Sequence, residues 1–221
     1  MTQTPPPALH VEYFAVGPLR CNCTIVADRD AGEAIVVDGG DEPERVLTRL
    51  SKLGVRAVHL VHTHAHIDHI GALAELHEAT GANGLLHHAD MPLYEMLRIQ
   101  ASWIGIPVPK AAKIDDDLRD GDQVRAGAAT LDVLHTPGHT LGSVSFGLAL
   151  DRRTMLLTGD TLFAGSVGRW DLGGTSLEDI VRSIRTKLLV FPDETVVVPG
   201  HGPTTTIGTE RRENPFLTTP S

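Results

Sequence analysis

Five of the twelve histidines in this chain lie in one short run, HLVHTHAHIDHIG, at residues 59–71. Within it, His64, His66, Asp68 and His69 follow a predicted buried strand and precede a predicted helix. Residues that leave the end of a strand reach the rim of a sheet, where loops converge on a site. Alternation along an extended turn can point His64 and His66 at one position, while Asp68 and His69 can point at a neighbouring one. Because imidazole and carboxylate groups bind Zn²⁺, Fe or Mn²⁺, the spacing predicts two adjacent metal ions.

Three later segments place the same residue types at the ends of predicted strands. HTPGHT offers His135 and His139, LLTGDTLF offers Asp160, and VVVPGHGP offers His201. A lone histidine is more often an ordinary surface or hydrogen-bonded residue, but here the sequence of strand, ligand and glycine turn recurs. Counting one histidine from HTPGHT, the set holds five histidines and two aspartates, which is enough for a dinuclear site with one shared carboxylate.

The elements that must position these residues follow from hydrophobic periodicity and turn signals. Strands are predicted at 11–16, 22–27, 34–40, 57–61, 84–88, 130–136, 143–150 and 154–160 and in TVVVPGHGP, and helices at 43–54, 70–80, 88–97 and 176–189. This order indicates two β-rich halves with helices outside, an α/β sandwich rather than one doubly wound sheet. We expect a disordered tail at 1–9, a single domain at 10–221, and an irregular surface excursion at 100–122 that covers the cleft.

The segments THAHIDH, TPGHT, GDTLF and PGHGP, in this order, resemble the metallo-β-lactamase fold superfamily. Within it they are most similar to the glyoxalase II (hydroxyacylglutathione hydrolase) branch, in particular its small single-domain bacterial type. The resemblance runs from about Val11 to Leu217 and implies a four-layer αββα sandwich. It also implies the ligands, with His64, His66 and His139 for the first metal ion, Asp68, His69 and His201 for the second, and Asp160 as the bridge. His62 and His135 have no ligand counterpart, and His62 is expected either to pack or to support a ligand.

The resemblance implies a cofactor of two divalent metal ions, zinc with iron or manganese as alternatives, and catalysis by a hydroxide that bridges them. A water shared by two cations loses a proton near neutral pH, so no serine or cysteine nucleophile is needed. Asp68 is the predicted catalytic residue, because besides being a ligand it can orient this hydroxide. Cys21 and Cys23 lie far from the motifs in sequence and show no base partner, so we expect reduced structural thiols.

The predicted activity is hydrolysis of a thioester such as S-D-lactoylglutathione or a related hydroxyacyl thioester. The family's C-terminal helical domain, which grips glutathione, is expected to be missing, because about twenty residues follow His201. Phe163, Arg169 and Trp170 are the candidate substrate-binding residues, with Arg169 either contacting a substrate carboxylate or pairing with Asp171. The sequence GRWD also resembles the persulfide dioxygenase branch, which uses one iron. A lactonase and a non-catalytic metal-binding scaffold are further alternatives, although the scaffold would be expected to lack a ligand.

The composition of the chain restricts the classes of partner that we expect it to bind. The formal net charge of −9, without a run of Lys or Arg, argues against nucleic acid or an anionic membrane as a partner and leaves a small-molecule substrate. No apolar run approaches the roughly 20 residues of a membrane span, and the start MTQTPPPALH lacks the features of a signal peptide. We therefore expect a cytoplasmic protein. Its oligomeric state stays open, with a homodimer as one alternative.

Overall fold

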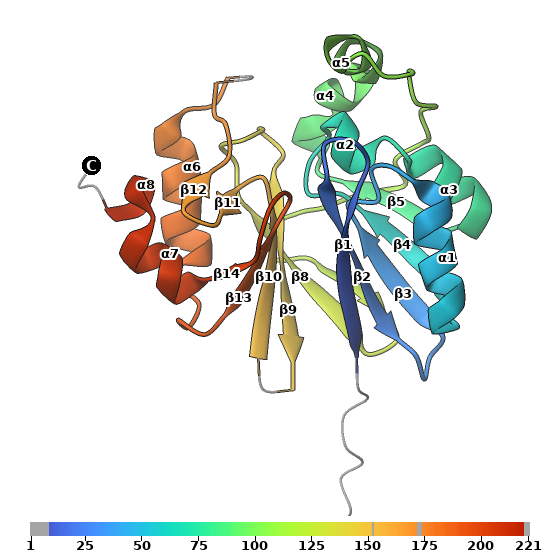
Figure 1. The fold of residues 1–221 in the computed structure, drawn as a ribbon, viewed down its shortest axis with the longest axis horizontal. Helices are drawn as coiled ribbons and strands as arrows, with labels where there is room; N and C mark the ends of the chain where they lie inside the picture. Colours follow the sequence, from blue (N-terminus) through green and yellow to red (C-terminus); the bar gives the residue numbers. More distant parts are fainter. Residues whose placement is uncertain (1–8, 152, 172–173, 219–221) are drawn as a thin grey trace, which may run out of the picture.

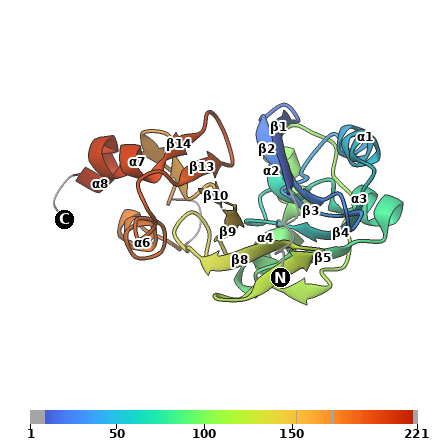
Figure 2. The same ribbon diagram turned by 90° about the horizontal axis from the view of Figure 1, so that it is seen from below.

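Two β-sheets pack face to face, and helices cover the outer face of each (Figure 1). The structure, a computed structural model, describes residues 9–151, 153–171 and 174–218. The first sheet and its helices come from the N-terminal part of the chain, and the second sheet and its helices follow. A view turned by 90° shows the two halves side by side (Figure 2). The layers are helix, sheet, sheet, helix, which confirms the predicted αββα sandwich.

The first sheet keeps its strands in chain order. These are β1 (His10–Val16), β2 (Cys21–Asp28), β3 (Glu33–Val37), β4 (Arg56–Val61), β5 (Asn83–Leu86) and β6 (Asp116–Asp117). Pairing is antiparallel from β1 to β3 and parallel from β3 to β6. The helices of this half are α1 (Pro43–Leu53), α2 (Ile67–Ile70), α3 (Leu73–Thr80), the 3₁₀-helix η1 (His88–Asp90), α4 (Met91–Glu95) and α5 (Leu97–Ile104). Parallel strands need crossover connections, which here carry the helices.

The second sheet is mostly antiparallel. Its order is β14 (Thr205–Thr206), β13 (Val196–Pro199), β10 (Arg153–Gly159), β9 (Val144–Leu150), β8 (Ala129–His135) and β7 (Gln123–Ala126), and only β10 and β13 pair in parallel. A hairpin of β11 (Leu162–Phe163) and β12 (Ser166–Val167) follows β10. The helices are α6 (Leu177–Ser183), its π-helical continuation η2 (Ile184–Leu188), α7 (Ile207–Glu213) and α8 (Pro215–Thr218). Ser176 caps α6, as the sequence predicts for a Ser or Thr.

Alternation of side chains along the strands divides the apolar residues among three cores. In β2, Ile25 packs under the helices of the first half, while its neighbour Val26 faces the second sheet. In β10, Leu157 lies between the sheets, while its neighbour Leu156 packs under α6. Full burial of one such side chain contributes about 1.5–3 kcal/mol. The three cores thereby hold the ends of the strands in fixed positions relative to one another.

Two sequence expectations are corrected. The helix expected at 70–80 begins only at Leu73, and Ile70 instead ends the short helix α2; the helical backbone is interrupted at Ala72, with φ −93° and ψ 12°. The segment 100–122 is also more ordered than expected. Helix α5 extends through its first five residues, and β6 joins the edge of the first sheet. Burial of Ala101 and Leu118 accounts for this order.

The tail predicted at 1–9 lies outside the described residues except for Leu9, which packs against the core between the sheets. Among the described residues, no helix is long and apolar enough to cross a membrane. The short elements β7, β14, α7 and α8 were not predicted from the sequence.

Asp28 connects the two sheets through its carboxylate. The side chain is only 5% exposed; its Oδ2 accepts a hydrogen bond from the Ala128 amide at 2.8 Å, and its Oδ1 accepts from the amides of Asp30 and Ala31, both at 3.0 Å. Ala128 lies in the turn between β7 and β8, whereas Asp30 and Ala31 lie in the turn between β2 and β3. The Asp28 side chain therefore links a turn of the first sheet to a turn of the second. These hydrogen bonds, that of Ala128 first, lower the pKa of Asp28.

The Asp28→Ala variant is expected to have a lower free energy of unfolding than the wild type at neutral pH, measured by urea denaturation. Because the folded-state pKa is below the unfolded value of about 3.9, the carboxylate stabilises the fold above that pH and ceases to do so as pH falls through the folded-state pKa. The difference between the two proteins should therefore be constant from about pH 5 to 8 and shrink below about pH 4. Asp30→Ala is the control, and a difference that is unchanged at pH 3 would contradict this role.

Candidate metal centre

Four strands deliver the seven predicted ligands to one region. By strand, these are His64, His66, Asp68 and His69 after β4, His139 after β8, Asp160 after β10 and His201 after β13. Three groups of these side chains offer ligand atoms that all lie within 4.8 Å of one another. The groups are His64, His66 and His139; Asp68, His69 and His201; and His64, His69 and Asp160. The structure thus brings together residues separated by up to 137 positions, from His64 to His201.

In the first group, three ring nitrogens meet. His66 Nδ1 lies 2.9 Å from His64 Nε2 and 2.9 Å from His139 Nε2. His139 Nδ1 donates to the Arg169 carbonyl oxygen at 2.8 Å, so its Nε2 carries a lone pair when the ring is neutral. His64 is held likewise, because Thr63 Oγ1 lies 3.1 Å from its Nδ1. A hydrogen on His66 Nδ1 can be donated to the lone pair of only one of the other two nitrogens. A metal cation, in contrast, can bind the lone pairs of all three nitrogens.

The second group repeats this arrangement with a carboxylate. His69 Nδ1 lies 3.0 Å from Asp38 Oδ2, and His201 Nδ1 lies 3.0 Å from the Leu19 carbonyl oxygen. Their Nε2 atoms face each other at 3.3 Å. Asp68 Oδ2 lies 3.1 Å from His201 Nε2 and 3.7 Å from His69 Nε2. Two nitrogens and one oxygen therefore converge, and this donor set suits Zn²⁺ or iron.

Asp160 lies between the two groups. Its Oδ1 is 3.5 Å from His69 Nε2 and 3.8 Å from His201 Nε2, while its Oδ2 is 3.6 Å from His139 Nε2. Oδ1 is buried and has no hydrogen-bond partner among the described residues. Since an unpartnered buried carboxylate oxygen is costly, a cation on each side fits this side chain, and each oxygen can serve a different ion.

Two histidines of the first group, His64 and His66, favour the neutral form. Burial and the neighbouring imidazoles lower the pKa of His64 well below its usual value, and burial, His139 and His69 lower the pKa of His66 to about 3. Neutral imidazole is the form that binds metal, so protons compete weakly at this position.

The second group has the opposite electrostatics. Burial acts to lower the pKa of His69, but the carboxylates around it, Asp68, Asp160 and Asp38, raise it well above its usual value. Burial acts to raise the pKa of Asp68, but His69 and His201 hold it well below its usual range. These side chains therefore attract positive charge, which a proton or a metal ion can provide.

Asp38 supports both groups and was not identified by sequence analysis. Its Oδ2 accepts from Thr63 Oγ1 at 2.7 Å and contacts His69 at 3.0 Å, and its Oδ1 accepts from the Thr63 amide at 2.8 Å. Through Thr63 it also orients His64. Asp38 adopts a positive φ of 53°, uncommon for a residue other than glycine. The acidic residue before the two glycines in VVDGG was the available signal, which sequence analysis took only as a turn.

Two glycines make room for the ligands. A Cβ on Gly40, in the same VVDGG loop, would lie 1.8 Å from the Asp68 carbonyl oxygen. A Cβ on Gly200 would lie 2.2 Å from Asp160 Oδ1. Loops from both halves can approach the ligands this closely only because these positions lack side chains.

Cys21 lies far from the motifs in sequence, but the fold brings its thiol beside a predicted ligand. Its Sγ lies 3.5 Å from His69 Nδ1, because the turn between β1 and β2 folds back to the site and Cys21 pairs with His201 in an isolated β-bridge. Burial raises the pKa of the Cys21 thiol to about 12, so it is a neutral neighbour of His69 at physiological pH. Both cysteines are free and buried.

The three candidate substrate-binding residues lie at different places. The Arg169 guanidinium is exposed and pairs with Asp171 at 3.0 Å, the second of its two predicted alternatives, while its carbonyl holds His139. Trp170 packs against Phe216 with ring centroids 5.9 Å apart. The Phe163 ring lies 6.5 Å from that of His201, a member of the second group. Their contribution to substrate binding stays a prediction.

Of the two histidines without a ligand counterpart, His62 is buried and supports the ligand segment. Its Nδ1 lies 2.9 Å from the His69 carbonyl oxygen, and burial lowers its pKa to about 4, so the neutral ring donates to the backbone of α2. His135 stacks on His87 with ring centroids 4.2 Å apart, away from the ligand groups.

The Asp38→Asn variant is expected to bind metal about 10- to 100-fold more weakly, the usual effect of removing a group that orients a ligand. Asparagine tolerates a positive φ, but its amide nitrogen cannot accept the hydrogen bonds that the carboxylate accepts from Thr63 and His69. Titration of the metal-free protein against a coloured chelator measures this affinity. Asp41→Asn in the same loop is the matched control, and unchanged affinity of Asp38→Asn would contradict the assigned role.

Comparison with known proteins gives the family. The model of the Metallo-beta-lactamase superfamily matches residues 16–201. Hydroxyacylglutathione hydrolase GloC of Haemophilus influenzae is 35% identical over 96% of this chain and 100% of its own. Among solved structures, BLEG-1 B3 metallo-beta-lactamase has a TM-score of 0.86 at 34% identity, covering 95% of this chain and 100% of its own.

Two further solved structures are similar. TTHA1623 in a di-iron-bound form has a TM-score of 0.82 at 38% identity, covering 93% of this chain and 100% of its own. ETHE1 from Myxococcus xanthus has a TM-score of 0.75 at 28% identity, covering 93% of this chain and 83% of its own. With the family model spanning most of its length, this chain belongs to the metallo-β-lactamase superfamily.

Proposed function

We propose that this metallo-hydrolase cleaves a thioester, such as S-D-lactoylglutathione or a related hydroxyacyl thioester, with two divalent metal ions, most simply zinc. The observation that carries the proposal is the position of Asp160 between two complete donor groups, with one oxygen toward each. His64, His66 and His139 would hold one ion, and Asp68, His69 and His201 the other. When bound, such ions activate water and polarise a carbonyl group.

The protein's own groups prepare the reaction. Asp68 is a carboxylate because of its lowered pKa, so it can accept a hydrogen bond from the attacking water and orient it. Asp38 and the carbonyl oxygens of Arg169 and Leu19 orient three histidine rings through contacts with their Nδ1 atoms. These rings belong to His69, His139 and His201. Cys21, a neutral buried thiol, takes no part as a nucleophile.

The relative from Haemophilus influenzae supports the choice of substrate class. That protein is named a hydroxyacylglutathione hydrolase and aligns with this chain over its entire length. This match over the relative's whole length supports a hydroxyacyl thioester as the proposed substrate.

A second candidate function is oxidation of a persulfide at a single iron. The sequence GRWD and the likeness to ETHE1 favour it, and the di-iron form of TTHA1623 shows that a similar protein takes iron. The complete second donor group favours two ions instead.

Metal analysis of the protein as purified, paired with two assays, separates the candidates. Two zinc-like ions per chain and hydrolysis of S-D-lactoylglutathione are expected. One iron per chain with oxygen uptake on glutathione persulfide would overturn the proposal.

The Asp68→Asn and His201→Ala variants are each expected to lower kcat/KM for the thioester by at least about a hundredfold, the scale lost when transition-state stabilisation is removed. Steady-state hydrolysis measured by release of the free thiol provides the test. His88→Ala, which changes an exposed histidine outside the donor groups, should retain wild-type activity. Full activity in either ligand variant would refute the dinuclear mechanism.

A further inference from the structure

An apolar pocket opens beside the first donor group. Its volume is about 290 Å³, and His66 and His139 form part of its wall. Pro92, Leu93 and Met96 line it from the region of α4, and Trp103 and Leu141 complete it from α5 and the loop after His139. A group bound here would touch the side chains that hold the first metal ion, so the pocket is continuous with the reaction site.

Among the described residues that line this pocket, no carboxylate or ammonium group is free to pair with a ligand. Asp90, the charged side chain among its apolar lining residues, is buried and accepts hydrogen bonds from the Ala65 amide at 3.0 Å, Thr140 Oγ1 at 2.8 Å and the Gly142 amide at 2.7 Å. Trp103 is nevertheless 67% exposed and Leu141 52% exposed. Large apolar side chains that stay exposed around a pocket indicate an apolar ligand that covers them.

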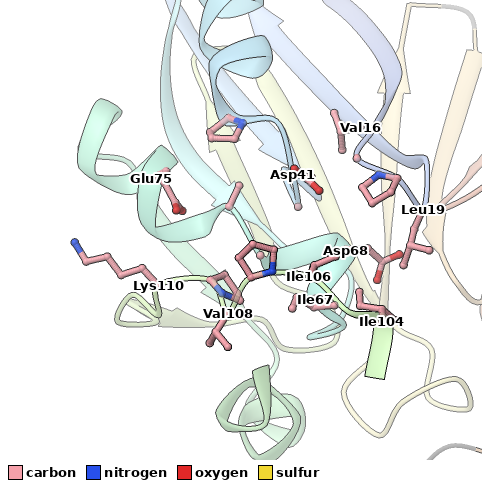
Figure 3. A pocket seen from close by; sticks show the side chains of 18 residues that line it. Val16, Leu19, Asp41, Ile67, Asp68, Glu75, Ile104, Ile106, Val108 and Lys110 are labelled. Carbon is pink, nitrogen blue, oxygen red and sulfur yellow. The ribbon is translucent and has the colours of Figure 1, made fainter. Parts of the chain in front are cut away.

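A second pocket, of about 520 Å³, lies on the side of Asp68 and has a different character. Figure 3 shows Asp68 and Leu19 at one side of it and Glu75 and Lys110 at the other, with Asp41 in its wall. The Lys110 ammonium is paired with Glu78. This pocket therefore presents polar groups at a distance from the donor groups, with apolar walls between.

We propose that the apolar pocket beside His66 and His139 receives the acyl group of the thioester, and that the protein selects apolar acyl chains longer than lactoyl. This inference rests on the proposed function. Hydrolysis forms a bond from the water oxygen to the acyl carbon, breaks the carbon–sulfur bond and transfers a proton to the leaving thiolate. The carboxylic acid then remains in the apolar pocket, and the more polar thiol arm lies toward the second pocket.

Trp103 and Leu141 are the specificity-determining residues of this proposal, because they are large apolar side chains that stay exposed at the pocket. Each buried methylene contributes a factor of roughly four in transition-state binding. The preference for chain length should therefore increase until the pocket is filled.

The test uses N-acetylcysteamine thioesters of acetate, lactate, butanoate and hexanoate, so that the thiol is small, neutral and constant. For the wild-type protein, kcat/KM should increase roughly fourfold per methylene from acetyl to hexanoyl, and lactoyl should not exceed butanoyl. Trp103→Ala and Leu141→Ser should each lower kcat/KM for hexanoyl by at least about tenfold while changing that for acetyl little.

Ile99→Ala, an exposed apolar residue on α5 outside the pocket, is the control for Trp103, and Leu177→Ser on α6 is the control for Leu141. Equal kcat/KM for all chains, or a preference that survives both pocket variants, would overturn the acyl pocket and leave thioester hydrolysis intact. No hydrolysis of any thioester by the metal-loaded protein would instead overturn the proposed function.

A binding measurement separates the pocket from catalysis. The thioether S-hexyl-N-acetylcysteamine cannot be hydrolysed and should change the tryptophan fluorescence of the wild-type protein at lower concentration than the S-methyl thioether. The change should be lost in Trp103→Phe. Equal concentrations for the two thioethers, or an unchanged signal in the variant, would contradict the placement of the chain beside Trp103.

Discussion

The orientation of the histidine rings is the constraint on which this site depends. Each ring that turns Nε2 toward the centre is held at its other nitrogen by an acceptor or hydroxyl group, namely Thr63 for His64, Asp38 for His69, the Arg169 carbonyl for His139 and the Leu19 carbonyl for His201. These partners hold the rings so that the Nε2 lone pairs point toward one another around Asp160. Such an arrangement is unfavourable alone and becomes favourable when cations occupy the space between them.

The sandwich brings the histidines and their hydrogen-bond partners together because the ends of β4, β8, β10 and β13 meet at one edge of the fold. The grouping of these seven side chains was predictable from sequence, since a strand followed by a histidine or aspartate and a glycine turn is a local pattern. The four-layer architecture was predictable for a similar reason, from the order of strands and helices together with the family resemblance. The division of α2 from α3 was not, because the irregular backbone lies at Ala72, a residue type that favours helices.

The supporting residues were beyond sequence reasoning for a different reason. Asp38 and Cys21 contact His69 from 31 and 48 positions away, and the Leu19 carbonyl reaches His201 across 182 positions. The two contacts with His69 form within the first half of the fold, and the contact of Leu19 with His201 forms only when the two sheets pack together. The apolar pocket is also a tertiary feature, because α4, α5 and the loop at Leu141 each contribute a few side chains that carry no motif. In this fold, the residues suited to the chemistry can thus be recognised from local sequence patterns. Substrate selectivity depends instead on surfaces assembled from distant segments.

The most direct test of the central claim is anomalous X-ray diffraction from crystals of the zinc-loaded protein, recorded at the zinc absorption edge. Our account predicts two anomalous peaks, one among His64, His66 and His139 and one among Asp68, His69 and His201, with Asp160 between them. A single peak, in either position, from fully loaded protein would contradict it.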